Sequence, residues 1–143
     1  MIRRATPNDT EAILQIWLAA SIEAHNFIAP SFWEVQVENM RNIYLPSSEA
    51  YVYEHQTNVL GFYALSCDTL AAIFVSPSHQ GKGLGKSLIK HAKQQRKSLF
   101  LSVYKDNKNS IAFYSKQGFE SIGEQVDKHT GYTELKMRKA SVD

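Results

Sequence analysis

Hydrophobic positions recur at helical spacing near the start of the chain and at strand-like spacing further along. Between residues 13 and 24, apolar side chains return every third or fourth position, which predicts an amphipathic helix after a short strand at 2–4. The Thr-Pro-Asn-Asp run at 6–9 supplies the N-cap, the first-turn proline and the acidic residue that a helix start favours. A second amphipathic helix is expected to begin at a capping box, residues 31–34, and to end before Pro46.

The middle of the chain is rich in aromatic and β-branched residues. Segments 50–54, 59–66 and 69–75 predict three successive antiparallel strands separated by turn formers. The third strand shows no polar alternation after Thr69, which is typical of a strand covered on both faces, so we expect it at the centre of the sheet. From 83 to 97 the apolar residues share one helical face, which predicts a crossover helix.

The last part of the chain alternates strand and helix and then closes as a hairpin. Residues 99–104 predict a strand, and residues 109–117 predict a short helix that Gly118 ends through a left-handed C-terminal cap. Segments 119–126 and 132–138 predict the two strands of the hairpin.

Taken in order, these elements read β α α β β β α β α β β and predict an α/β (α+β) fold. We expect a mixed central sheet of about seven strands flanked by about four helices. A length of 143 residues with 43% hydrophobic residues suits one domain, 1–143.

Charge and cysteine content narrow the functional classes. The formal net charge is only +2, which argues against a strong general field for nucleic acid or for a membrane surface. The lone Cys67 cannot form an internal disulfide, and no Cys/His spacing indicates a metal site, so we expect no metal. The sequence carries no signal-peptide pattern and no membrane span, so we expect a cytoplasmic protein, monomeric or homodimeric.

A glycine-rich segment lies between the predicted central strand and the crossover helix, at 80–86. Glycines at such a junction let main-chain N–H groups point together towards a phosphate, and the helix N-terminus adds partial positive charge. A P-loop NTPase would need a glycine where Gln80 stands, and a Rossmann loop would need one where Lys86 stands. The alternatives left are a phosphate site of another kind and a glycine-rich turn without a ligand.

Two motifs in this chain resemble those of small bacterial GNAT N-acetyltransferases. Gln80-x-x-Gly83-x-Gly85 resembles the acetyl-CoA loop of that family. Segment 107–119, with Asn at its start, Phe-Tyr within it and Gly-Phe at its end, is similar to the second signature, although Ser110 stands where alanine is usual. The resemblance implies the GNAT fold and transfer of the acetyl group of acetyl-CoA to a primary amine, either a lysine side chain or a small lysine-like amine.

The resemblance also implies roles for individual residues. Main-chain groups of the central strand would bind the pantetheine arm, the glycine loop would hold the pyrophosphate, and Asn107 would hydrogen-bond the pantetheine end. Tyr114 would protonate the departing CoA sulfur; the alternative is that this tyrosine only packs on the sheet. The implied cofactor-binding residues are Ile73, Phe74, Val75, Gln80, Gly81, Lys82, Gly83, Leu84, Gly85, Lys86, Asn107, Phe113 and Tyr114.

The general base is less well defined. Ser102 stands where some relatives carry a glutamate, so that role cannot be transferred. His25 is the preferred candidate because it lies in the connection between the first two helices and titrates near neutrality, the alternative being a structural histidine. Weaker candidates are Glu23, Asp68 and His79.

The acceptor pocket is expected to have aromatic walls. Phe27 and Trp33 are the predicted substrate-binding residues, with Tyr63 as a further candidate. The helix connection, 21–31, offers only Glu23 as an acid, which favours a lysine-like amine over a multiply cationic aminoglycoside.

Two other functions are left open by the sequence. The serine at 102 would also suit a CoA-binding module without catalysis. An acetylating toxin acting on aminoacyl-tRNA would share the fold, but its expected basic face is not matched by the near-neutral charge. The expected partners are therefore acetyl-CoA and an amine acceptor, with no nucleic acid and no membrane.

Overall fold

A seven-stranded mixed sheet runs through the protein, which a computed structural model describes over residues 1–140. Its strand order is β1-β2-β3-β4-β5-β7-β6, so β4 is the central strand, as the sequence predicted. The strands are β1 (Ile2–Arg4), β2 (Glu49–His55), β3 (Asn58–Ser66), β4 (Thr69–Val75), β5 (Ser98–Tyr104), β6 (Glu120–Val126) and β7 (Thr133–Ala140). The helical elements are η1 (Pro7–Asp9), α1 (Thr10–Ala24), α2 (Pro30–Glu34), α3 (Val37–Asn39), η2 (Met40–Tyr44), η3 (Pro77–His79), α4 (Leu84–Gln95) and α5 (Lys108–Lys116).

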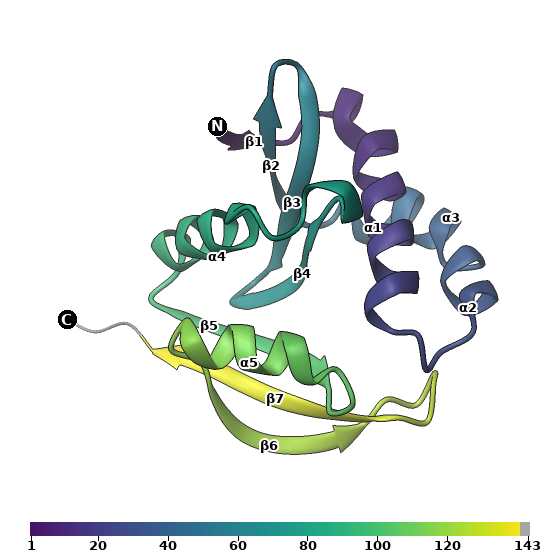
Figure 1. Cartoon of the computed structure of the whole chain (residues 1–143), viewed down its shortest axis with the longest axis vertical. Helices are drawn as coiled ribbons and strands as arrows, with labels where there is room; N and C mark the ends of the chain where they lie inside the picture. The colour runs from purple at the N-terminus through teal and green to yellow at the C-terminus, as the bar shows by residue number, and fades with distance from the viewer. Residues whose placement is uncertain (141–143) are drawn as a thin grey trace.

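Helices cover both faces of the sheet (Figure 1). Side chains of β3 alternate between the two sides, so that Phe62 packs with α1 while Tyr63 packs with α4. Each face thus has its own hydrophobic core, and the expected fold and element order are confirmed.

The sheet splits between β4 and β5. These parallel strands pair only at Thr69 and Phe100, and beyond that point they diverge (Figure 1). The prediction that β4 is covered on both faces was wrong for its second half, because residues 73–75 are only half-buried. An apolar run predicted burial, but the split leaves these residues facing a gap that no strand fills.

The second helix differs from its predicted form. It begins at Pro30, with Ala29 as the N-cap and no side-chain cap bond, so the expected capping box at 31–34 is not formed. Proline fixes φ near the helical value and lacks the N–H that a cap would satisfy, so the N-cap can lie two residues earlier, at Ala29 instead of Ser31. The helix is also broken into α2, α3 and the π-helical turn η2.

The capping box that the sequence predicted at Thr6 and Asp9 forms at η1, the 3₁₀ turn that leads directly into α1. Asp9 is 7% exposed, and its carboxylate accepts bonds of 2.8 and 2.9 Å from the Arg3 guanidinium and one of 2.8 Å from the Thr6 amide. The bonds from Arg3 come first among the causes that lower the pKa of Asp9 to about 2.

We expect Asp9→Asn to destabilise the protein by about 2 kcal/mol at pH 7, because the carboxylate is more acidic in the folded chain than in the unfolded one. This contribution is present above about pH 4 and is lost as the pH falls through 2. Urea unfolding at pH 7 and at pH 2 measures it. Glu11→Gln, at an exposed carboxylate paired with Arg41, is the matched control and should change stability by less than about 1 kcal/mol.

Candidate active site

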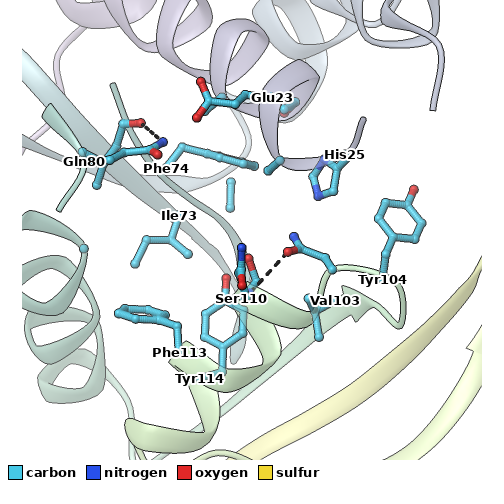
Figure 2. A pocket seen from close by; sticks show the side chains of 18 of the residues that line it. Glu23, His25, Ile73, Phe74, Gln80, Val103, Tyr104, Ser110, Phe113 and Tyr114 are labelled. Carbon is cyan, nitrogen blue, oxygen red and sulfur yellow. Dashed lines mark hydrogen bonds between the residues drawn. The ribbon is translucent and has the colours of Figure 1, made fainter. Parts of the chain in front are cut away.

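A cleft of about 990 Å³ opens where β4 and β5 diverge. The end of α1, the loop before α4 and the start of α5 supply its walls. Figure 2 shows Glu23 and His25 on one side of this space and Phe113 and Tyr114 on the opposite side. Segments that are far apart in the sequence therefore meet around one space.

The loop before α4 presents main-chain amides at one end of the cleft. Gly81 and Gly83 have φ angles of 79° and 84°, in the left-handed region that favours glycine. The first bond of α4 runs from the Ser87 amide to the Gly83 carbonyl at 3.1 Å, so the amides of 84–86 have no partner within the helix. Free amides at the positive end of a helix suit a phosphate group.

The polar side chains of the same loop differ in whether they reach the cleft. The Gln80 amide donates to the Val75 carbonyl at 3.2 Å, so this side chain fixes the loop to the end of β4. Lys86 lines the cleft, whereas Lys82 is not among its lining residues. Of these two lysines, Lys86 is therefore the one placed to contact an anion in the cleft.

The edge of β4 that faces the cleft has no neighbouring strand beyond Thr69. Residues 73–75 pair with β3 on their other edge, so main-chain groups on the cleft side can bind an extended group. Across the cleft, Asn107 caps α5: its Oδ1 accepts from the Ser110 amide at 3.3 Å, which leaves its NH₂ group for the cleft. An extended arm with amide groups, such as pantetheine, fits between these two surfaces.

Tyr114 points its hydroxyl into the cleft between Ile73 and Ser110 (Figure 2). Burial raises the pKa of this phenol well above its usual value of 10. The hydroxyl therefore keeps its proton throughout the physiological pH range and is available as a donor.

His25 lies on the opposite wall, at the C-cap of α1. Its ring is stacked on Trp33 at 5.0 Å and meets the ring of Tyr104 edge-on at 5.3 Å. Burial lowers the pKa of His25 below 6.5, although the Ser21 carbonyl partly opposes this effect. The imidazole is therefore neutral at pH 7 and able to accept a proton.

Comparison with known proteins identifies the fold and the chemistry together. The family model for the acetyltransferase (GNAT) domain matches residues 46–121. The peptidyl-lysine N-acetyltransferase YiaC of Escherichia coli is 35% identical over 123 residues, which cover 85% of this chain and 84% of that protein. The chain belongs to the GNAT acetyltransferase family. It is an acetyl-CoA-dependent N-acetyltransferase, and acetyl-CoA is its co-substrate.

Solved structures of family members share the whole fold. The apo form of Escherichia coli YjaB superimposes with a TM-score of 0.86 at 26% identity, covering 99% of this chain and 98% of that one. The PaiA N-acetyltransferase of Thermoplasma acidophilum, solved with coenzyme A, superimposes with a TM-score of 0.80 at 17% identity and covers 98% of both chains. Over residues 1–140, the helices are too short or too polar for any of them to cross a membrane.

A GNAT enzyme with this cleft is expected to use Tyr114 as its acid. Tyr114→Phe should keep the affinity for acetyl-CoA and lower kcat about 10²-fold, because the ring remains and only the proton donor is lost. A thiolate is already a tolerable leaving group, which limits the loss. Steady-state rates at saturating amine measure the effect, and an unchanged kcat would remove Tyr114 from the reaction.

The structure shows which of the weaker candidates for the general base lie in the cleft. Glu23 and His79 line the cleft, as does the preferred His25, but Asp68 does not. The Asp68 carboxylate lies 3.6 Å from the Arg96 guanidinium. Asp68 is therefore excluded as a base on position alone.

Tyr63 is not part of the acceptor wall. It is fully buried on the α4 side of the sheet, where its hydroxyl lies 2.6 Å from His91 Nδ1. The predicted role was wrong because successive residues of a strand face opposite sides of the sheet. In β3, it is the neighbouring Phe62 that faces α1, the helix whose end forms a wall of the cleft. Phe27 and Trp33 do line the cleft, and their roles in substrate binding stay predictions.

Among the cleft residues that the sequence did not single out are Tyr104, Asp106 and Glu134. Tyr104 and Asp106 adjoin the Asn107 motif, so their position in the sequence was a usable signal. Glu134 comes from β7 and is placed by its register opposite Tyr104, which no local pattern reveals. The cleft thus carries two acids besides Glu23, which weakens the charge-based argument against cationic acceptors with several amines.

Proposed function

We propose that this enzyme acetylates the ε-amine of lysine side chains in proteins or peptides, in the cytoplasm. The observation that carries the proposal is the placing of a neutral, buried histidine among aromatic rings, across the cleft from Tyr114. Such a site accepts the apolar stem of lysine and removes a proton from its end. The name of the relative YiaC, a peptidyl-lysine N-acetyltransferase, supports the same acceptor.

The cleft offers opposite charges to the two substrates. Free amides and Lys86 stand at the end before α4, where they suit phosphate groups. Glu23, Asp106 and Glu134 line the cleft with His25 and attract an ammonium group. This combination of charges favours an anionic donor and a cationic acceptor.

The proposed reaction divides its tasks among separate elements. A lysine amine has a pKa near 10.4, so His25 must take its proton for most of the substrate to react at pH 7. Main-chain amides on the open edge of β4 stabilise charge on the carbonyl oxygen. Tyr114 donates a proton to the leaving sulfur, so the base and the acid act from opposite walls.

The test is a comparison of kcat/KM for a lysine peptide with a blocked N-terminus and for an aminoglycoside. The proposal expects the peptide to be preferred, because a flexible alkyl stem fits between the rings better than a polyhydroxylated sugar. The same peptide with arginine in place of lysine is the matched control and should show no transfer. Preference for the aminoglycoside would contradict the proposed acceptor.

A further inference from the structure

The turn between β6 and β7 touches the connection between α1 and α2 (Figure 1). The Tyr132 hydroxyl donates to the Phe27 carbonyl at 2.9 Å, across 105 positions of sequence, and the two rings lie 5.0 Å apart. Phe27 lines the cleft and Tyr132 does not. Tyr132 therefore supports the acceptor wall from behind.

A second hydrogen bond connects the same turn to Tyr104. The Tyr104 hydroxyl donates to Asp127 at 2.5 Å, and the other oxygen of that carboxylate accepts from the His129 amide at 2.9 Å. Burial favours the protonated form of Asp127, but the bonds from Tyr104 and His129 outweigh it and leave its pKa below the usual value. The carboxylate is therefore charged at neutral pH and holds the Tyr104 hydroxyl, so the ring of Tyr104 and not its oxygen borders His25.

Phe27, Trp33 and Tyr104 form an aromatic collar around His25. Their ring centroids lie 6.1, 5.0 and 5.3 Å from that of His25, and the rings of Phe27 and Tyr104 are 5.7 Å apart. His25 is only 9% exposed within this collar and still lines the cleft, so an amine reaches the imidazole through a narrow opening. Two of the three collar residues are held by the β6–β7 turn, so the turn decides whether the collar stays closed.

We propose that Tyr132 and Asp127 are positioning residues that keep the aromatic collar closed and make the enzyme selective for amines at the end of an unbranched alkyl chain. This inference rests on the proposed acetylation of lysine. A lysine ε-amine follows four methylenes and passes a narrow collar, whereas the α-amine of a peptide stands on a branched carbon and is excluded. Loosening the collar should therefore reduce the preference for ε-amines over α-amines.

Two peptides of otherwise equal sequence measure this preference. One carries a single lysine and a blocked N-terminus, and the other carries a free N-terminus and arginine in place of lysine. In Tyr132→Ala, we expect the ratio of kcat/KM for the two peptides to fall about tenfold or more, with most of the change being a higher kcat/KM for the peptide with the free N-terminus. Tyr132→Phe keeps the ring contact and should retain most of the ratio.

Asp127→Ala should act like Tyr132→Ala, because it frees the Tyr104 ring. Asp127→Asn keeps an oxygen that accepts from Tyr104 and should lie between wild type and Asp127→Ala. Tyr44→Ala removes an exposed tyrosine of η2 that does not line the cleft, and it is the matched control with an unchanged ratio. The dissociation constant of acetyl-CoA should be unchanged in every variant, which separates a loosened acceptor wall from general damage.

An unchanged ratio in folded Tyr132→Ala and Asp127→Ala, with a wild type active on the lysine peptide, would overturn this inference alone. A wild type inactive on the lysine peptide would overturn the proposed function and the inference with it. If Tyr132→Ala does not fold, Asp127→Ala decides, and a wild-type ratio in folded Asp127→Ala contradicts the inference.

Discussion

Replacing Gly83 with valine is expected to abolish measurable binding of acetyl-CoA while the protein remains folded. Gly83 is the N-cap of α4 with a φ of 84°, and a β-branched residue cannot hold that conformation without strain. A side chain would not clash here, because a Cβ at Gly83 meets no atom within 4 Å. The loss comes from the main chain, since leaving the left-handed region turns the amides of 84–86 away from the phosphates.

Gly85→Ala is the matched control for this variant. Gly85 has an ordinary helical conformation, and its Cβ would lie 3.7 Å from the Phe113 ring and 3.8 Å from Val75, both ordinary contacts. We expect less than about tenfold loss of affinity for Gly85→Ala and more than about 100-fold for Gly83→Val. Calorimetric titration with acetyl-CoA measures both, with thermal unfolding to show that each variant is folded. Wild-type affinity in folded Gly83→Val would refute the placement of the phosphate site.

The second large effect is expected for His25→Ala with a lysine peptide. At pH 7 we predict a loss of kcat/KM of about 10²- to 10³-fold, because the amine must then lose its proton to water. In the wild type the rate should rise with pH up to the lowered pKa of His25, below 6.5, and then level off. In His25→Ala it should keep rising towards the pKa of the amine, near 10.4.

A profile of kcat/KM from pH 5 to pH 10 distinguishes the two enzymes. His55→Ala is the matched control, since His55 is an exposed histidine at the end of β2 that does not line the cleft. If the profiles of wild type and His25→Ala superimpose, His25 is not the base. The proposed lysine acceptor would be unaffected by that result.

The sequence predicted most of the fold because each element carries a local signal. The strands have apolar or alternating runs, and Gly118 ends α5 in the left-handed conformation with a φ of 93°. The parting of β4 and β5 has no local signal, because an apolar strand reads as buried whether protein or cofactor covers it. The resemblance to GNAT enzymes, and not a local pattern, was what implied that residues 73–75 face the cofactor.

The candidate site was predictable where a motif fixes the main chain and unpredictable where the sheet register fixes a side chain. Gly81, Gly83 and Asn107 lie in motifs whose spacing is read directly. Glu134 reaches the cleft only because β7 pairs with β5 in one register, and Tyr63 was misplaced because one step along β3 changes the face. The missed Glu134 and the misplaced Tyr63 have the same cause, because the periodicity of a sequence does not encode how distant strands pair.

The most direct test of the account is mass spectrometry of a lysine peptide and a mixture of folded proteins after incubation with isotopically labelled acetyl-CoA. The account predicts labelled acetyl groups on lysine ε-amines with wild-type enzyme and none with Gly83→Val. Binding of acetyl-CoA by the wild type without any labelled lysine, across the peptide and the proteins, would contradict it and indicate a different acceptor or a CoA-binding module without catalysis.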